Sequence, residues 1–159
     1  LEGKLVIPGV IEPHIHARDL QQPEKEDWSS VSRAALKGGV TTVFDMPNTV
    51  PATTNLTNLN IKREAAKKAL VNYKFYLGAT DSNLNEIKNI LSEKPADIVG
   101  IKVFLSASNS NEIIRSKNNL RKIFQLAKTY DKVVAVHTEL QEIIDFWSQK
   151  IETKTILTH

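Results

Sequence analysis

The chain has 159 residues, of which 41% are hydrophobic and 25% charged, and its formal net charge is +3. This composition is typical of a globular domain that can bury one core. The absence of cysteine excludes disulfides and thiolate metal sites and is typical of a reducing compartment such as the cytoplasm. The basic residues are scattered and no apolar run approaches about 18 residues, so we expect neither nucleic-acid binding nor a membrane span.

The first predicted strand opens the stretch of residues 10–19 and ends in His14 and His16. Because successive side chains of a strand alternate between its two faces, both imidazoles point the same way. Two such rings can hold one metal ion if further ligands come from elsewhere. The simpler alternative is a pair of surface or core histidines with satisfied hydrogen bonds.

Helices and strands then alternate along the rest of the chain. Asp27 is a plausible N-cap of the first helix, and Gly38 and Gly39 end it. Five helices are predicted, over residues 28–37, 59–70, 83–93, 111–130 and 140–150. Five more strands are predicted, over residues 40–45, 72–78, 98–105, 133–137 and 154–159. The strands are near-continuous apolar runs, which is typical of a parallel sheet buried on both faces.

The remaining histidines and one lysine also fall on predicted strands. His137 ends the fifth predicted strand and His159 ends the sixth, whereas Lys102 lies inside the fourth. Lysine is rarely buried without a partner, so Lys102 needs an explanation. Four histidines at strand ends and one misplaced lysine are hard to obtain by chance. We therefore expect a metal site with nitrogen and oxygen ligands.

Two α/β architectures fit this order of elements, an open doubly wound sheet and a (β/α)8 barrel. The glycine-rich phosphate motif expected after the first strand of a dinucleotide-binding sheet is absent. The candidate ligands end several different strands and have to converge on one point, which a barrel achieves at its carboxyl face. We therefore predict a partial TIM-type barrel with about six of its eight βα units present.

Lys102 cannot bind a cation as an ammonium group. Desolvation lowers the pKa of a lysine, and a neutral amine can add carbon dioxide to form an anionic carbamate. The two oxygens of the carbamate could bridge two metal ions. On spacing alone, a carboxylate partner or a side chain that reaches solvent explains Lys102 equally well.

Five short motifs resemble, in the same order, those of the amidohydrolase superfamily, and within it those of class I-like dihydroorotases. They are HIHAR at residues 14–18, GGVTTVFDMPNT at 38–49, GIKVF at 100–104, VHTE at 136–139 and LTH at 157–159. The first motif without its arginine marks only the superfamily. With Arg18 and the Met-Pro-Asn-Thr sequence it is far more specific. The resemblance runs from about residue 5 to the end of the chain.

The resemblance implies the metallo-dependent hydrolase fold with a binuclear zinc centre. His14 and His16 would bind one zinc ion and His137 and His159 the other, with carbamylated Lys102 and a hydroxide bridging the two. The family interconverts dihydroorotate and N-carbamoyl-L-aspartate in pyrimidine biosynthesis. In hydrolysis the bridging hydroxide would attack the ring amide carbonyl.

Two further positions match residues that hold the substrate carboxylate in this family, namely Arg18 and Asn48. A planar guanidinium gives charge-assisted hydrogen bonds to a carboxylate, and an amide adds a neutral donor. The simpler alternatives are a loop salt bridge for Arg18 and a turn role for Asn48.

The catalytic aspartate of the family follows the eighth strand, and we expect it outside this chain. Residues 1–159 would form an incomplete amidohydrolase barrel domain with strands one to six, and neither Asp19 nor Asp45 matches the missing position. The small β domain that usually precedes the first strand is also expected to be absent. We therefore expect the isolated polypeptide to be inactive.

Two alternative functions remain open. A hydantoinase or allantoinase relative would act on another cyclic amide, although those substrates carry no ring carboxylate for Arg18 to bind. A non-catalytic dihydroorotase-like subunit would serve as a scaffold and would purify without stoichiometric zinc. The expected partner is a small-molecule substrate, and self-association into a homo-oligomer is left open.

Overall fold

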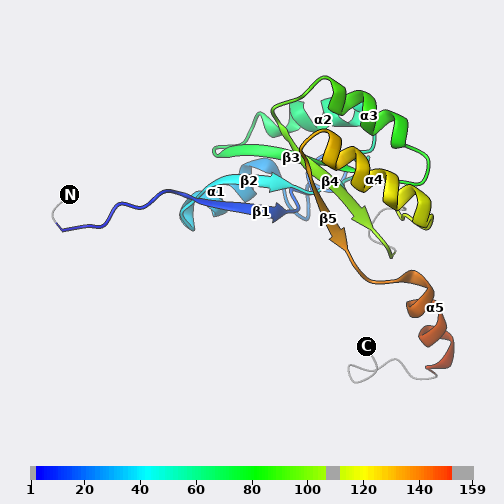
Figure 1. Ribbon diagram of the computed structural model, residues 1–159. Helices are drawn as coiled ribbons and strands as arrows, with labels where there is room; N and C mark the ends of the chain where they lie inside the picture. The colour runs from blue at the N-terminus through cyan, green and yellow to red at the C-terminus, as the bar shows by residue number, and fades with distance from the viewer. Residues whose placement is uncertain (1–2, 107–111, 152–159) are drawn as a thin grey trace.

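The computed structural model describes residues 3–106 and 112–151, in which strands and helices alternate along the chain (Figure 1). The strands are β1 (Val10–Ile15), β2 (Val40–Asp45), β3 (Asn72–Gly78), β4 (Ile98–Phe104) and β5 (Val133–His137). The helices are α1 (Trp28–Lys37), α2 (Leu56–Ala66), α3 (Leu84–Ser92), α4 (Lys117–Thr129) and α5 (Gln141–Lys150). None of the helices formed by these residues is both long and apolar enough to span a bilayer.

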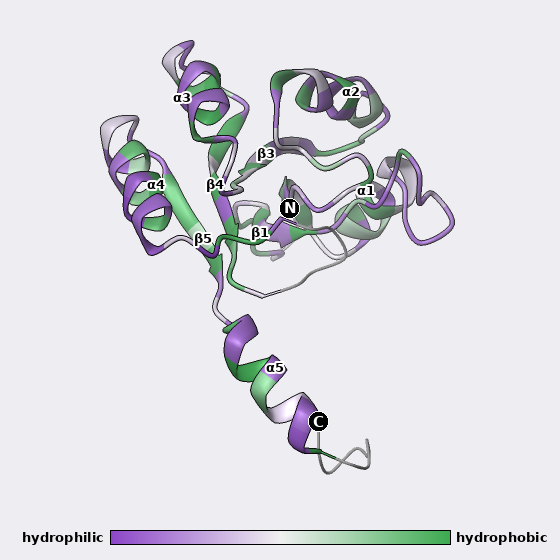
Figure 2. Cartoon of the chain, turned by 90° about the vertical axis from the view of Figure 1, so that its right-hand side faces the viewer, coloured by the Kyte–Doolittle hydropathy of each residue, from purple (hydrophilic) through white to green (hydrophobic). Residues whose placement is uncertain are grey.

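The five strands are all parallel and pair in chain order, β1-β2-β3-β4-β5. A doubly wound sheet would instead reverse its strand order at a switch point. Figure 2 shows α1, α2, α3 and α4 in an arc outside the strands, the arrangement of a (β/α)8 barrel. The predicted partial TIM-type barrel is therefore confirmed, and the carboxyl ends of its strands lie along one edge of the sheet.

Most strand predictions agree closely with the structure. The strands predicted over residues 40–45, 72–78 and 133–137 have these bounds in the structure. The sixth predicted strand, residues 154–159, lies outside the described residues.

The predicted starts of two helices are wrong. Helix α2 begins at Leu56 rather than at residue 59, because the Asn55 side chain accepts a hydrogen bond from the amide of Asn58 at 2.8 Å. Helix α4 begins at Lys117 rather than at residue 111, because Ser116 Oγ accepts a hydrogen bond from the amide of Asn119 at 3.2 Å. In both cases the side-chain cap, not the apolar spacing, determines where the helix starts.

The core lies around the two strands β3 and β4. Phe75, Leu77 and Ile101 are completely buried there. The edge strands differ, since Val10 of β1 is 51% exposed and Val133 of β5 is 58% exposed. The prediction of strands buried on both faces therefore holds at the centre of the described sheet and is wrong at its edges, where each strand has one neighbour.

Gly100 lets β4 and β5 approach each other closely. A Cβ atom at this position would lie 2.5 Å from the main-chain oxygen of Val133. Because that oxygen cannot move without separating the strands, Gly100→Ala should lower the free energy of unfolding by about 1–3 kcal/mol. Thermal unfolding of the whole protein measures this effect. Gly38→Ala is the control, since its Cβ would meet nothing closer than 3.5 Å, and equal losses from both changes would contradict the prediction.

Candidate functional site

The first two predicted metal ligands lie together at the carboxyl end of β1. His14 is in the strand and His16 follows it, with Ile15 between them. Their ring centroids are 5.3 Å apart. The alternation of strand side chains thus brings the two imidazoles to the same side of the sheet edge.

Both imidazoles are neutral at physiological pH. Burial lowers the pKa of His16 to about 4, and the positive charge of Arg18 adds to this effect, while the hydrogen bond to Asn48 opposes it. Burial also lowers the pKa of His14, and so does the charge of Lys102. A neutral imidazole keeps one nitrogen lone pair, which is available to a cation.

Lys102 is buried in β4, with 2% of its surface exposed. Its Nζ lies 4.9 Å from the centroid of the Phe104 ring, and no hydrogen bond or ion pair joins it to another described residue. Burial lowers the pKa of its amine. Its charge acts on His14 and His16 across the sheet edge. Within residues 3–106 and 112–151, Lys102 therefore lacks the carboxylate partner that the simpler interpretation needs.

The third predicted histidine ligand, His137, ends the neighbouring strand β5. It pairs in register with Phe104, and the two ring centroids are 5.9 Å apart. Its Nε2 lies 3.1 Å from a carboxylate oxygen of Glu139. The fourth, His159, lies outside the described residues.

The two predicted substrate-binding residues contact each other. Arg18 donates from Nη1 to the main-chain oxygen of Asn48 at 2.7 Å. The side-chain oxygen of Asn48 lies 2.8 Å from Nδ1 of His16. Asn48 is buried and Arg18 is partly buried, so the loop after β1 and the loop after β2 form one connected group of polar side chains.

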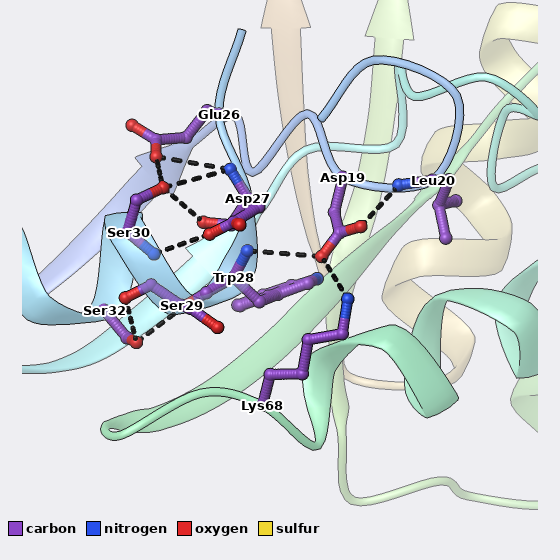
Figure 3. Close-up of polar contacts among 9 residues, drawn as sticks. All are labelled: Asp19, Leu20, Glu26, Asp27, Trp28, Ser29, Ser30, Ser32 and Lys68. Carbon is purple, nitrogen blue, oxygen red and sulfur yellow. Dashed lines mark hydrogen bonds and ion pairs between the residues drawn. The ribbon is translucent and has the colours of Figure 1, made fainter. Parts of the chain in front are cut away.

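Figure 3 shows how the loop that carries Arg18 is held in place. The buried carboxylate of Asp19 accepts hydrogen bonds from the amide of Leu20 at 2.7 Å and from that of Trp28, the first residue of α1, at 3.3 Å. Lys68 lies 3.3 Å from the same carboxylate. A carboxylate at a helix N-terminus is favourably placed, so Asp19 anchors the Arg18 loop to the helical layer.

Comparison with known proteins identifies the family of this chain. The model of the amidohydrolase family matches residues 5–159, nearly the whole sequence. This chain is an amidohydrolase family member. The resemblance to the amidohydrolase superfamily that the sequence predicted is thus confirmed.

Several amidohydrolase relatives are similar to this chain. The dihydroorotase of Methanosphaera stadtmanae is 31% identical over 147 residues, which are 92% of this chain and 32% of that protein. The allantoinase of Streptomyces avermitilis is 36% identical over 114 residues, 70% of this chain and 25% of that protein. The structure of an L-hydantoinase from Arthrobacter aurescens superposes with a TM-score of 0.88 at 30% identity, covering 99% of this chain and 36% of its own. The chain spans about a quarter to a third of the length of the curated relatives it matches.

The described residues of this amidohydrolase chain fit a metal centre in the type of donor they offer. Two neutral imidazoles, a third on β5 and a buried amine lie at one sheet edge. Within residues 3–106 and 112–151, however, no group of three or more His, Cys, Asp or Glu side chains is placed to hold a metal ion. A complete site therefore needs oxygen donors on Lys102 or ligands from the rest of the protein.

Three polar residues near this edge, namely Asp45, Lys62 and Glu139, have contacts that the sequence did not predict. Lys62 Nζ and Asp45 Oδ2 form an ion pair of 2.7 Å with 1% and 0% of the side chains exposed. From its residue type alone, Lys62 was indistinguishable from the solvent-exposed lysines of the predicted helix. A signal was present, because Lys62 shares the helical face of Leu59 and Ala66, and all three are buried.

Proposed function

We propose that the whole protein is a metal-dependent hydrolase of cyclic amides that interconverts dihydroorotate and N-carbamoyl-L-aspartate. The observation that carries this proposal is the buried amine of Lys102, which has no ion-pair partner among the described residues and whose charge lowers the pKa of His14 and of His16. Burying such a group is unfavourable unless the site uses it. The family and its dihydroorotase, allantoinase and L-hydantoinase relatives support the reaction class.

In this proposal two zinc ions are held by His14, His16, Lys102, His137 and His159. Lys102 would take part as a carbamate, since its neutral amine can add carbon dioxide with release of one proton. When bound, such a zinc pair lowers the pKa of water to about 7 and polarises a carbonyl group. The protein's contribution is to keep His14 and His16 neutral and the lysine amine desolvated before the ions arrive.

Neighbouring side chains support a defined tautomer for two of these imidazoles. If Nδ1 of His16 donates to Asn48, the lone pair of His16 is on Nε2. If Nε2 of His137 donates to Glu139, its lone pair is on Nδ1. In each case the partner would leave the other ring nitrogen with a lone pair for a cation.

Arg18 would bind the carboxylate of the substrate. Among the described residues, its hydrogen bond to the main-chain oxygen of Asn48 is the only one it makes. A guanidinium has five N–H donors, so several of them remain for a ligand. The Asp19 anchor keeps this guanidinium close to His16, and the carboxylate and the scissile amide of one small substrate can be bound together.

A hydantoinase-type activity is the second candidate. It is favoured by the L-hydantoinase structure, which superposes with a TM-score of 0.88. A non-catalytic scaffold is the third, and the zinc content of the purified protein separates it from both enzymes. A stoichiometric zinc content would exclude the scaffold.

A substrate panel tests the proposal. The whole protein, purified with zinc, is assayed with dihydroorotate, N-carbamoyl-L-aspartate, hydantoin and allantoin. Turnover of the first two only is expected, and turnover of hydantoin or allantoin only would replace the proposal with the alternative. Rescue of a dihydroorotase-deficient strain without added pyrimidine would assign the activity to pyrimidine biosynthesis. The cysteine-free sequence predicts the cytoplasm as the compartment of this activity.

Asn48→Leu should weaken zinc binding, because it removes the oxygen that orients His16. Loss of an outer-shell partner typically reduces metal affinity by about 10–100-fold. Asn48→Asp keeps an acceptor at the same place and should bind zinc more tightly than Asn48→Leu. Competition titration with a chelator measures both. If zinc affinity is unchanged and only KM rises, Asn48 serves the substrate alone.

A further inference from the structure

A buried ion pair lies under the sheet edge that carries His14 and His16. It joins Lys62 of α2 to Asp45 at the end of β2, with Nζ and Oδ2 2.7 Å apart. Asp45 pairs in register with Ile15, so its side chain points to the opposite face of the sheet from the two imidazoles. The pair therefore lies between the sheet and the helical layer.

Beyond the contact between them, the two side chains bond to the backbone next to His16 and to the residue that follows β2. Asp45 Oδ1 accepts from the amide of Ala17 at 2.9 Å. Lys62 Nζ also donates to the main-chain oxygen of Met46 at 2.6 Å, and the amide of Met46 donates to the main-chain oxygen of Ile15 at 2.9 Å. The peptide groups on both sides of His16 are thus bonded to Asp45 or Met46, and both of those are bonded to Lys62.

Stability alone gives a weak reason for such a pair. Two buried charges lose their hydration, and an apolar pair of similar volume is often as stable or more stable. Burial raises the pKa of the Asp45 carboxyl, against the opposing effect of Lys62, which shows that the site is unfavourable for a charge on its own. A buried ionic group is, by contrast, well suited to fix one backbone geometry where several would pack equally well.

We propose that the Lys62–Asp45 pair is a positioning device that holds the backbone of His16 in the geometry required for metal binding. Asp45 supplies the acceptor for Ala17, and Lys62 neutralises Asp45 and fixes Met46. This inference rests on the proposed function, because the role of His16 as a ligand is part of it. Neither residue touches the metal or the substrate.

Two uncharged double variants of the whole protein separate positioning from stability. The first, Asp45→Asn with Lys62→Gln, removes both charges and keeps an acceptor for Ala17 and a donor for Met46. The second, Asp45→Leu with Lys62→Met, fills the same space without polar atoms. Lys62→Met alone would leave an unpaired buried carboxylate and is expected to unfold most readily. The matched control is Arg63→Met with Asp97→Leu, which removes an ion pair whose side chains are 31% and 30% exposed and whose arginine is the next residue of α2.

Zinc affinity, thermal unfolding and hydrogen exchange of the amide of Ala17 are measured for each. We expect both double variants to fold, and we expect the apolar variant to bind zinc about 10-fold or more weakly than the first variant and to exchange Ala17 faster. The control should match wild type in zinc affinity. Equal zinc affinity and equal exchange in the two double variants would overturn the inference. If wild type binds no zinc, the proposed function fails, and the exchange of Ala17 still decides whether the pair holds this segment.

Discussion

Replacing Lys102 with alanine in the whole protein is expected to abolish stoichiometric zinc binding and to reduce turnover of dihydroorotate by more than about 100-fold. Loss of an outer-shell residue of a metal site already lowers metal affinity or activity by about 10–100-fold, and loss of a bridging ligand should lower it further. Lys102→Arg should fail equally, because a guanidinium stays protonated and cannot form a carbamate. Elemental analysis and steady-state kinetics measure the two effects.

Two comparisons separate this role of Lys102 from loss of the fold. Lys74→Ala removes an exposed lysine from the adjacent strand β3 and should leave zinc content and turnover unchanged. A small carboxylic acid such as acetate should partly restore the Lys102→Ala variant, because it supplies two oxygens in the space left by the side chain. Full activity of Lys102→Arg would show that the charge alone matters and that no carbamate is needed.

Replacing Arg18 with methionine is expected to change substrate preference more than overall activity. Removing a partly buried guanidinium that pairs with a substrate carboxylate weakens transition-state binding by about 2–5 kcal/mol. This corresponds to a fall of about 30-fold or more in kcat/KM for dihydroorotate. The fall should be absent for dihydrouracil, the same ring without the carboxylate. Steady-state assays with both compounds measure the difference.

The Arg18 result also decides between the two enzyme classes. Arg33→Met on the exposed side of α1 is the control and should affect neither compound. If kcat/KM for dihydroorotate is unchanged in the Arg18→Met variant, the proposal that Arg18 binds the substrate carboxylate is wrong. A hydantoinase-type activity would then become the better proposal.

The sequence predicts the barrel well because its strongest signals are local. Apolar β-branched runs define strands such as residues 40–45 and 72–78, and glycines or prolines separate them from the helices. The order of strands in the sheet depends on contacts between distant segments, so the sequence could favour a barrel only through the need for its ligands to converge. Helix starts were less predictable, because Asn55 and Ser116 act through single side-chain hydrogen bonds that apolar spacing does not contain.

The candidate site was predictable where a residue type conflicts with its surroundings. Lys102 in an apolar strand and His14 beside His16 stand out in the sequence, and the structure brings them to one edge. Lys62 and Asp45 stand out less, since an aspartate at a strand end is ordinary and only the helical face that Lys62 shares with Leu59 and Ala66 indicates its burial. Their pairing depends on how α2 packs on the sheet, which no short pattern encodes.

The arrangement of metal ions around Lys102 can be measured directly by anomalous diffraction at the zinc edge from crystals of the whole protein. We predict two peaks at the carboxyl edge of the strands, one beside His14 and His16 and one beside His137, with carbamate density on Lys102 between them. No peak at this edge, or an unmodified Lys102 amine paired with a carboxylate, would contradict the proposed metal centre and the hydrolase activity that depends on it.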